Sequence, residues 1–260
     1  MTKIRSWVFV AALVLGGTST AFAQSTCPTS IPANNLAISG VSATDGASYE
    51  IYIGNRTGGG NVGAVVKRNG VCLAGIRNVT KNGAQFSQVP TGINNLCFGS
   101  GVEVVTLMSS SLTFSTCSGQ VLNPLVDAGN TLTLYGSSGA DRFFGGPGTE
   151  IFWGGPGNDS LVGTSGVADQ LFGENDADQI SDNTGSFTWI DGGSGADTIV
   201  NQYGFFDTII GGSGNDLIDS SCNPAVIDCG SNTDSLWHPA HGGAEPPGCE
   251  VANVTHPTWC

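Results

Sequence analysis

The 260-residue sequence predicts an all-β protein whose main part is a parallel β-solenoid. A short glycine–aspartate phrase returns throughout residues 136–237, and an apolar residue recurs there every nine or ten positions. A helix would need a period near 3.6 and an isolated hairpin a period of 2, so neither explains this spacing. A unit of about nine residues, made of a turn and a short strand, does explain it. Two units would form one coil, and coils would stack as parallel strands about 4.8 Å apart.

The first 23 residues are expected to be a secretory signal peptide. Lys3 and Arg5 precede an apolar stretch at 7–15, and a small-residue A-x-A cleavage site follows at 21–23. A membrane anchor is disfavoured because a span needs about 20 apolar residues. The mature chain is therefore expected to be secreted or extracytoplasmic, in the periplasm or at the cell surface.

Composition and charge limit the partners. The formal net charge is -13 and only 11% of residues are charged, so the carboxylates are not balanced by Lys or Arg. A nucleic-acid partner, which needs a basic face, is excluded, and a cation is the natural one. All eight cysteines follow the predicted cleavage site, which indicates disulfides in an oxidising compartment. A zinc site is disfavoured because the sequence has no C-x-x-C pair.

Residues 24–130 are expected to be an irregular β lead-in or a small β domain, and a cap on the first coil is the favoured form. Short runs rich in β-branched residues predict strands at 62–70, 71–79, 102–107 and 112–114. A further strand is predicted at 131–134, where the repeat region begins. The cysteines of this segment allow three pairings, and the sequence does not choose among them: Cys27, Cys72, Cys97 and Cys117.

No catalytic arrangement is recognisable in this segment. Its acidic residues Asp45, Glu50, Glu103 and Asp127 look isolated in the sequence, whereas a glycosidase needs two carboxylates across one bond. No G-x-S-x-G motif accompanies the serines. We therefore expect a protein without enzymatic activity.

In the repeat region, 131–237, one apolar side chain per unit is expected to point inward. These residues are spaced by nine or ten positions: Phe143, Phe152, Leu161, Leu171, Ile180, Trp189, Ile199, Ile209, Ile218, Ile227 and Leu236. The glycines between them suit turns with positive φ and close approach of backbone carbonyls.

The acidic residues divide into two unlike edges if turns alternate between the sides of a coil. One edge keeps a carboxylate every 18 or 19 residues: Asp141, Asp159, Asp178, Asp197, Asp216 and Asp234. The other edge degenerates. At the positions equivalent to these carboxylates it has Glu150, Asp169, Phe187, Asp207 and Ala225.

Stacked carboxylates favour a bound cation. At about 5 Å and an effective dielectric constant near 20, each adjacent pair repels by roughly 3 kcal/mol. Calcium removes that repulsion and accepts about six to eight oxygen ligands, from carboxylates and carbonyls, in adaptable geometry. Magnesium fits less well because it demands a strict octahedron.

The phrases Gly154-Gly-Pro-Gly-Asn-Asp159, Gly192-Gly-Ser-Gly-Ala-Asp197 and Gly211-Gly-Ser-Gly-Asn-Asp216 resemble the haemolysin-type calcium-binding repeats of RTX proteins, which form a parallel β-roll. The resemblance covers residues 136–237 and implies Ca²⁺ bound between consecutive turns of one edge. It implies as ligands the carboxylates of Asp159, Asp178, Asp197, Asp216 and Asp234, with the carbonyls of Gly154, Pro156, Gly192, Ser194, Gly211 and Ser213.

Individual turns follow the repeat to different degrees. The pair 192–197 and 211–216 is the best preserved. Turn 173–178 departs at its second and fourth positions, and turn 136–141 lacks the second glycine.

The carboxy-terminal residues 238–260 are expected to form a disulfide-linked cap. Cys229 replaces the first glycine of the last repeat, and Cys249-Glu250 follows a Pro-rich stretch. This resembles the closing segment of related bacterial repeat arrays and implies a Cys229–Cys249 disulfide, leaving Cys222 with Cys260.

The chain as a whole is similar to small exported calcium-binding repeat proteins that carry little else. We expect a non-catalytic protein with a structural or adhesive role, whose further partner is cell-surface or matrix polysaccharide. The alternative is an extracellular polysaccharide-active enzyme that the calcium-binding roll stabilises.

Overall fold

The computed structural model describes residues 35–98, 101, 103–108, 112–114, 117, 120–125, 130–146, 148–164, 167–182, 184–220, 225–237, 246 and 248–251. The regular elements of these residues are β-strands, as expected. The expected signal peptide and the cysteines Cys27, Cys222 and Cys260 lie outside the described residues. No helix in the described part of the chain is long and apolar enough to cross a membrane.

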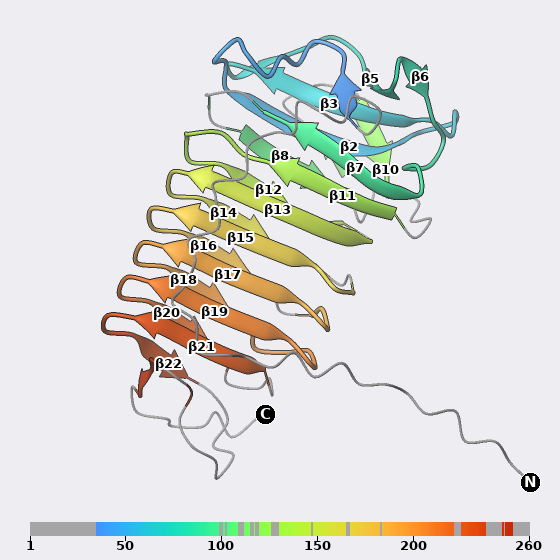
Figure 1. Cartoon of the computed structure of the whole chain (residues 1–260). Helices are drawn as coiled ribbons and strands as arrows, with labels where there is room; N and C mark the ends of the chain where they lie inside the picture. The colour runs from blue at the N-terminus through green and yellow to red at the C-terminus, as the bar shows by residue number, and fades with distance from the viewer. Residues whose placement is uncertain are drawn as a thin grey trace, which may run out of the picture.

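The repeats form two parallel sheets that face each other in a stack of coils (Figure 1). The first sheet contains β7 (Gly92–Cys97), β11 (Asn130–Tyr135), β13 (Thr149–Pro156), β15 (Gln170–Asn175), β17 (Trp189–Ser194), β19 (Thr208–Ser213) and β21 (Val226–Ser231). The parallel part of the second contains β8 (Glu103–Leu107), β12 (Arg142–Phe144), β14 (Ser160–Val162), β16 (Gln179–Ser181), β18 (Thr198–Val200), β20 (Leu217–Asp219), β22 (Ser235–Trp237) and β23 (Glu250–Val251). The predicted parallel solenoid is confirmed, and its parallel pairing reaches back to β7 and β8.

The amino-terminal strands cover the first coils with mostly antiparallel pairs. They are β1 (Leu36–Ile38), β2 (Tyr49–Arg56), β3 (Val62–Arg68), β4 (Val71–Cys72), β5 (Arg77–Lys81), β6 (Ala84–Gln85), β9 (Leu112–Phe114) and β10 (Gln120–Asn123). Strand β2 pairs antiparallel with β3 and parallel with β8, so it joins this cap to the roll. The strand expected over 71–79 is interrupted between β4 and β5, where Gly75 has a φ of 73°.

The core is a double column of apolar side chains, one per strand. The first sheet contributes Leu96, Leu134, Phe152, Leu171, Ile190, Ile209 and Ile227, and the second contributes Val105, Phe143, Leu161, Ile180, Ile199, Ile218 and Leu236. Each column is continuous because strands in register place equivalent residues over one another.

The inward position expected at Trp189 is wrong by one residue. Ile190 is fully buried and lies in register with Leu171 and Ile209, whereas Trp189 is 38% exposed. The turn between Ile180 and Ile190 is one residue longer than the turn between Ile190 and Ile199, since ten positions rather than nine separate the inward residues. This extra residue moves the inward position from Trp189 to Ile190.

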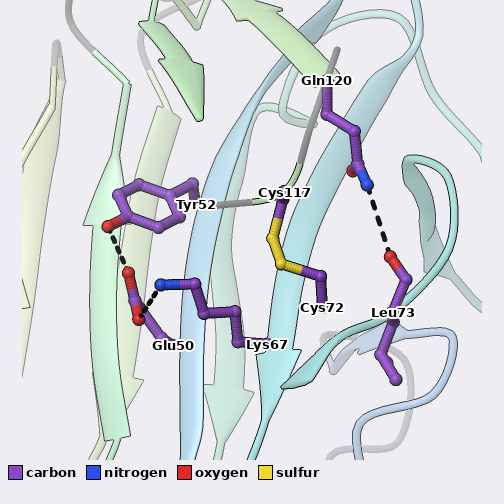
Figure 2. Close-up of a disulfide and its surroundings, with 7 residues drawn as sticks. All are labelled: Glu50, Tyr52, Lys67, Cys72, Leu73, Cys117 and Gln120. Carbon is purple, nitrogen blue, oxygen red and sulfur yellow. Dashed lines mark hydrogen bonds and ion pairs between the residues drawn. A yellow bond between two sulfur atoms is a disulfide. The ribbon is translucent and has the colours of Figure 1, made fainter. Parts of the chain in front are cut away.

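The structure describes two disulfides, one within the cap and one at the carboxy-terminal end of the roll. Cys72 pairs with Cys117 beside the Lys67–Glu50 ion pair (Figure 2), which resolves a pairing that the sequence leaves open. Cys229 pairs with Cys249, as expected. Since Cys229 belongs to the last complete coil, this bond fastens the tail to the end of the solenoid.

Candidate metal centre

The turns that join the first sheet to the second form an acidic edge. We give this name to turns 154–159, 173–178, 192–197, 211–216 and 229–234. Their second and fourth residues have positive φ, for example 99° at Gly193 and 148° at Gly195. Glycine is needed at 193 for a second reason, since a Cβ there would collide with the carbonyl of Glu174 in the preceding coil. The glycine spacing thus shapes each turn and permits close stacking.

Turn 173–178 keeps this conformation without the two glycines. Glu174 has a φ of 77° and Asp176 a φ of 73°, in the left-handed region that non-glycine residues rarely adopt. The neighbouring coils impose the turn on an unfavourable sequence. The departure from the repeat at these positions therefore appears as local backbone strain.

A continuous series of hydrogen bonds connects the carboxylates of the acidic edge. In each case the backbone N–H of one aspartate donates to Oδ1 of the aspartate one coil later. The bonds join Asp141 to Asp159 (2.7 Å), Asp159 to Asp178 (2.7 Å), Asp178 to Asp197 (2.8 Å), Asp197 to Asp216 (2.9 Å) and Asp216 to Asp234 (2.8 Å). This contact fixes the orientation of every carboxylate in the series.

The second carboxylate oxygen of each turn is buried and has no hydrogen-bond partner. This holds for Oδ2 of Asp159, Asp178, Asp197, Asp216 and Asp234, all of which are at most 2% exposed. A buried carboxylate oxygen without a partner is costly, so such a group points to a missing cation or proton. One orphaned oxygen recurs at the same position of every turn of the edge.

The first glycine of turns 154–159, 173–178, 192–197 and 211–216 leaves open the space beside that oxygen, whereas Cys229 stands at this position in turn 229–234. A Cβ on Gly192 would lie 2.6 Å from Oδ2 of Asp197 and 2.5 Å from the carbonyl oxygen of Gly211. The corresponding positions at Gly154 and Gly211 are bordered in the same way, by their own turn's Oδ2 and a carbonyl of the next coil. Carboxylate and carbonyl oxygens from two coils therefore meet at one place.

The other expected carbonyl ligands lie at strand ends next to these positions. Pro156, Ser194 and Ser213 are the last residues of β13, β17 and β19. The Ser213 carbonyl accepts a 2.8 Å hydrogen bond from the N–H of Gly195. Within the described residues, no three His, Cys, Asp or Glu side chains gather around one point. A metal site on this edge therefore has to combine carboxylates with backbone carbonyls.

Burial makes ionisation of these carboxylates unfavourable when no cation is present. It raises the pKa of Asp159 and of Asp178 to about 8, that of Asp197 to about 7 and that of Asp216 to about 6. The pKa of Asp234 is also raised, by burial and then by the nearby Glu250. Neighbouring carboxylates add to the effect, whereas the hydrogen bonds from the preceding coil oppose it.

The series extends further toward the amino terminus than the sequence indicates. Glu103 is not isolated: its N–H donates to Oδ1 of Asp141 at 2.9 Å, and its strand pairs in register with β12. Its pKa is raised to about 9, mainly by burial and also by Asp141. A signal exists in the sequence, since 99–103 reads Gly-Ser-Gly-Val-Glu and Val105 follows at the expected distance.

Asp141 differs from the later members because protein donors occupy both of its oxygens. Its Oδ2 accepts hydrogen bonds from the N–H of Ser137 at 2.7 Å and from the Ser137 hydroxyl at 3.1 Å. Serine stands here where the repeat has its second glycine. The first carboxylate of the repeats is therefore satisfied without a metal.

Two carboxylates of the opposite edge have a side-chain donor at Oδ2. Oδ2 of Asp182 accepts from the Thr188 hydroxyl at 2.6 Å, and Oδ2 of Asp207 accepts from the Asn201 amide at 3.1 Å. The residue in register with Asp207 is Thr188, whose N–H donates to Oδ1 of Asp207 at 2.8 Å. The expectation of Phe187 at this position is wrong, by the same one-residue shift as Trp189.

Phe187 instead occupies the extra turn position with a φ of 61° and points to solvent. It stacks on Phe206, which has a φ of 63°, with 5.2 Å between ring centroids. The two side chains are 57% and 74% exposed. Near the amino-terminal end of the same edge, Asp169 retains an Oδ2 without a hydrogen-bond partner. The turns of this edge therefore differ from one another in whether a donor reaches the second carboxylate oxygen.

Comparison with known families agrees with this geometry. A model described as RTX calcium-binding nonapeptide repeat matches in four copies, at residues 133–161, 153–181, 189–200 and 204–221. No curated protein and no solved structure matches the chain. The matched repeat family binds calcium, and the comparison finds no catalytic domain. The orphaned Oδ2 atoms and the spaces beside them fit such an ion.

Proposed function

We propose that this chain, whose RTX-type repeats form a parallel β-roll, is an exported, non-catalytic protein that folds around calcium bound on its acidic edge. The single observation that carries the proposal is the recurring buried Oδ2 without a partner, one per turn from Asp159 to Asp234. Bound calcium would supply the positive charge that these ionised carboxylates lack.

The groups of each turn have different roles in the proposed site. Oδ1 of each aspartate holds the N–H of the preceding coil and so directs Oδ2 away from it. The first glycine of the turn leaves room for an ion, and the carbonyl of the next coil lies at the same place. The proposed ligands are those that the resemblance implies, with Gly192, Asp197, Gly211 and Asp216 forming the best preserved site.

A non-catalytic role is supported by the surroundings of the amino-terminal carboxylates. Glu50 forms an ion pair with Lys67 at 2.8 Å, and Asp45 forms one with Arg68 at 2.9 Å. Glu103 belongs to the carboxylate series. Glu50 and Asp45, which look isolated in the sequence, are thus held in ion pairs, which weighs against the alternative of a polysaccharide-active enzyme.

Export is supported by the disulfides and by the expected signal peptide. A rigid roll suits a structural or adhesive role, with calcium as its ligand and surface or matrix polysaccharide as its proposed partner. In this proposal, the roll of 131–237 is the calcium-binding unit, the strands before it form a cap, and the tail closes the other end.

Thermal unfolding of the mature chain with calcium and with a chelator tests the proposal. We expect a large fall in melting temperature on chelation, because a bound ion stabilises the folded state by mass action. Circular dichroism gives the melting temperature, and titration calorimetry gives the number of ions. A melting temperature that is identical with calcium and with chelator would rule the proposal out.

A further inference from the structure

The edge opposite the acidic edge carries a cluster of exposed apolar side chains. Its turns 164–169, 182–188 and 201–207 lie in consecutive coils, since the N–H of Ala168 donates to the carbonyl of Ser186 at 2.9 Å and that of Phe187 to the carbonyl of Phe205 at 3.0 Å. We call the cluster the aromatic edge, and its members are between 45% and 74% exposed: Val167, Phe187, Tyr203, Phe205 and Phe206. Half of the ten large hydrophobic residues that are exposed in the described part of the chain thus gather on three turns.

The backbone holds two of these aromatic residues in a conformation that bulky residues rarely adopt. Ala168, Phe187 and Phe206 occupy the same position in successive coils, with φ of 66°, 61° and 63°. Glycine would suit this position without strain, yet phenylalanine occupies it twice. The two phenylalanine rings stack with an interplanar angle of 16°. An unfavourable conformation that displays two stacked rings to solvent points to a contact that these rings make.

The surface of the aromatic edge lacks exposed charge. The sequence of its three turns contains no Lys, Arg or Glu, and its three aspartates are at most 1% exposed: Asp169, Asp182 and Asp207. Two polar side chains of these turns are directed inward, the Thr188 hydroxyl onto Asp182 and the Asn201 amide onto Asp207. In a chain with a formal net charge of -13, two copies can therefore bring this face together without opposing exposed charges.

The apolar area of the aromatic edge is large enough for a small protein–protein interface. If a full aromatic side chain presents about 150–250 Å², the five members together expose roughly 500 Å². Soluble monomers rarely expose a contiguous apolar patch of more than a few hundred Å². Two copies would bury roughly 1,000 Å² of it, which is the area at which specific association begins. The abundance of Phe and Tyr and the lack of charge also match the core of an interface.

We propose that the aromatic edge is a homodimer interface, in which the stacked Phe187 and Phe206 of one copy pack against the aromatic edge of a second copy. A twofold arrangement uses the same patch on both copies and closes after two. The lack of basic residues in the three turns disfavours an anionic lipid surface as the occupant. The inward direction of Thr188 and Asn201 disfavours a saccharide at this edge, since a saccharide needs outward hydrogen-bonding groups. The inference does not rest on calcium binding, because the acidic edge lies on the other side of each coil.

Sedimentation velocity on the full mature chain in calcium tests the interface. We expect the wild type to be dimeric at concentrations on the order of 10–100 µM and to dissociate on dilution. Phe187→Gly/Phe206→Gly removes both rings and relieves the strain at positive φ, so this variant should stay folded and be monomeric over the same range. The control Val71→Ser/Leu217→Ser removes two exposed apolar side chains from other surfaces and should remain dimeric.

A second variant and a folding control keep the outcome clear. Phe205→Glu would oppose like charges across the interface without a change at a strained position, so it should also be monomeric, and circular dichroism should show the same fold for all variants. A wild type that stays monomeric up to about 100 µM would overturn the proposal, as would a glycine variant that is as dimeric as the wild type. Binding of a monomeric wild type to zwitterionic vesicles through Phe187 and Phe206 would overturn it in favour of a lipid surface. A wild type that dimerises but binds no calcium would overturn the proposed function alone.

Discussion

The backbone N–H of Asp197 donates a 2.9 Å hydrogen bond to Oδ1 of Asp216, one coil further along the chain. Each carboxylate of the acidic edge therefore has two separate roles. Its Oδ1 holds neighbouring coils together, and its Oδ2, which has no hydrogen-bond partner, is the proposed calcium ligand. Substitutions that treat these two oxygens differently can separate the structural role from the binding role.

Asp197→Ala and Asp216→Ala should each weaken calcium binding more than Glu150→Gln. The first two remove a carboxylate of the best preserved site, whereas Glu150 lies on the opposite edge. We expect the loss of at least one bound ion for each alanine variant and little change for the control, measured by calorimetry.

The Asp216→Asn variant separates the two roles. It keeps an oxygen for the Asp197 N–H, so the calcium-free melting temperature should be equal to or above that of the wild type. Stabilisation by added calcium should be smaller. A calcium response equal to that of the wild type would contradict the assignment of Asp216 as a ligand.

Calcium-free stability should fall as the pH rises. The pKa values of Asp159 and Asp178 are raised to about 8 in the folded chain, and that of Asp197 to about 7, mainly by burial. A folded pKa above the ordinary value of 3.8 means that the folded state binds more protons, so its stability decreases between about pH 4 and pH 8.

Calcium affinity should change in the opposite direction over the same range, because protons compete with the ion for the same oxygens. Urea unfolding in chelator at pH 5 and pH 8 measures the first trend, and calorimetry at the same two values measures the second. Calcium-free stability that rises with pH would show that other groups control the fold.

Glu174→Gly should stabilise the roll. Glu174 has a φ of 77°, and a non-glycine residue in this region costs about 1–3 kcal/mol, which exceeds the entropy that glycine adds to the unfolded chain. We expect the free energy of unfolding to rise by about 1 kcal/mol in saturating calcium. The converse change, Gly193→Ala, should destabilise, because its Cβ would strike the Glu174 carbonyl.

Ile190→Ala should destabilise far more than Trp189→Ala. Ile190 is fully buried in the core column, and such truncations cost about 2–5 kcal/mol. Trp189 is 38% exposed, so its larger side chain should contribute less. Chemical denaturation of the two variants measures the difference, and the reverse order would mean that Trp189 points inward after all.

The roll can be predicted from the sequence because its glycines and apolar residues repeat at the spacing of the coil. It is insufficient at Trp189 and Ile190, since two adjacent apolar residues satisfy the same period and only the turn length selects between them. That length becomes visible in the pairing of Ile190 with Leu171.

The other features of the structure that the sequence does not predict have a common cause, which is pairing between segments far apart in the chain. Glu103 precedes Asp141 by 38 residues rather than 18 or 19, so only the short phrase Gly-Ser-Gly-Val-Glu at 99–103 indicates their shared register. Glu250, whose Oε2 accepts a 2.6 Å hydrogen bond from the N–H of Asp234, follows that residue by 16 positions. The antiparallel pairs of the cap, such as β1 with β5, likewise depend on contacts that no period records.

Stacking in equal steps makes the length of the roll adjustable in whole coils. Deletion of 179–197 would join Asp178 to Thr198 and remove 19 residues, bringing β14 over β18 and β15 over β19 with the carboxylates still aligned. The chain would shorten by about 4.8 Å along the stack. Duplication or loss of such a segment in the gene would therefore change the reach of the protein while preserving its way of folding.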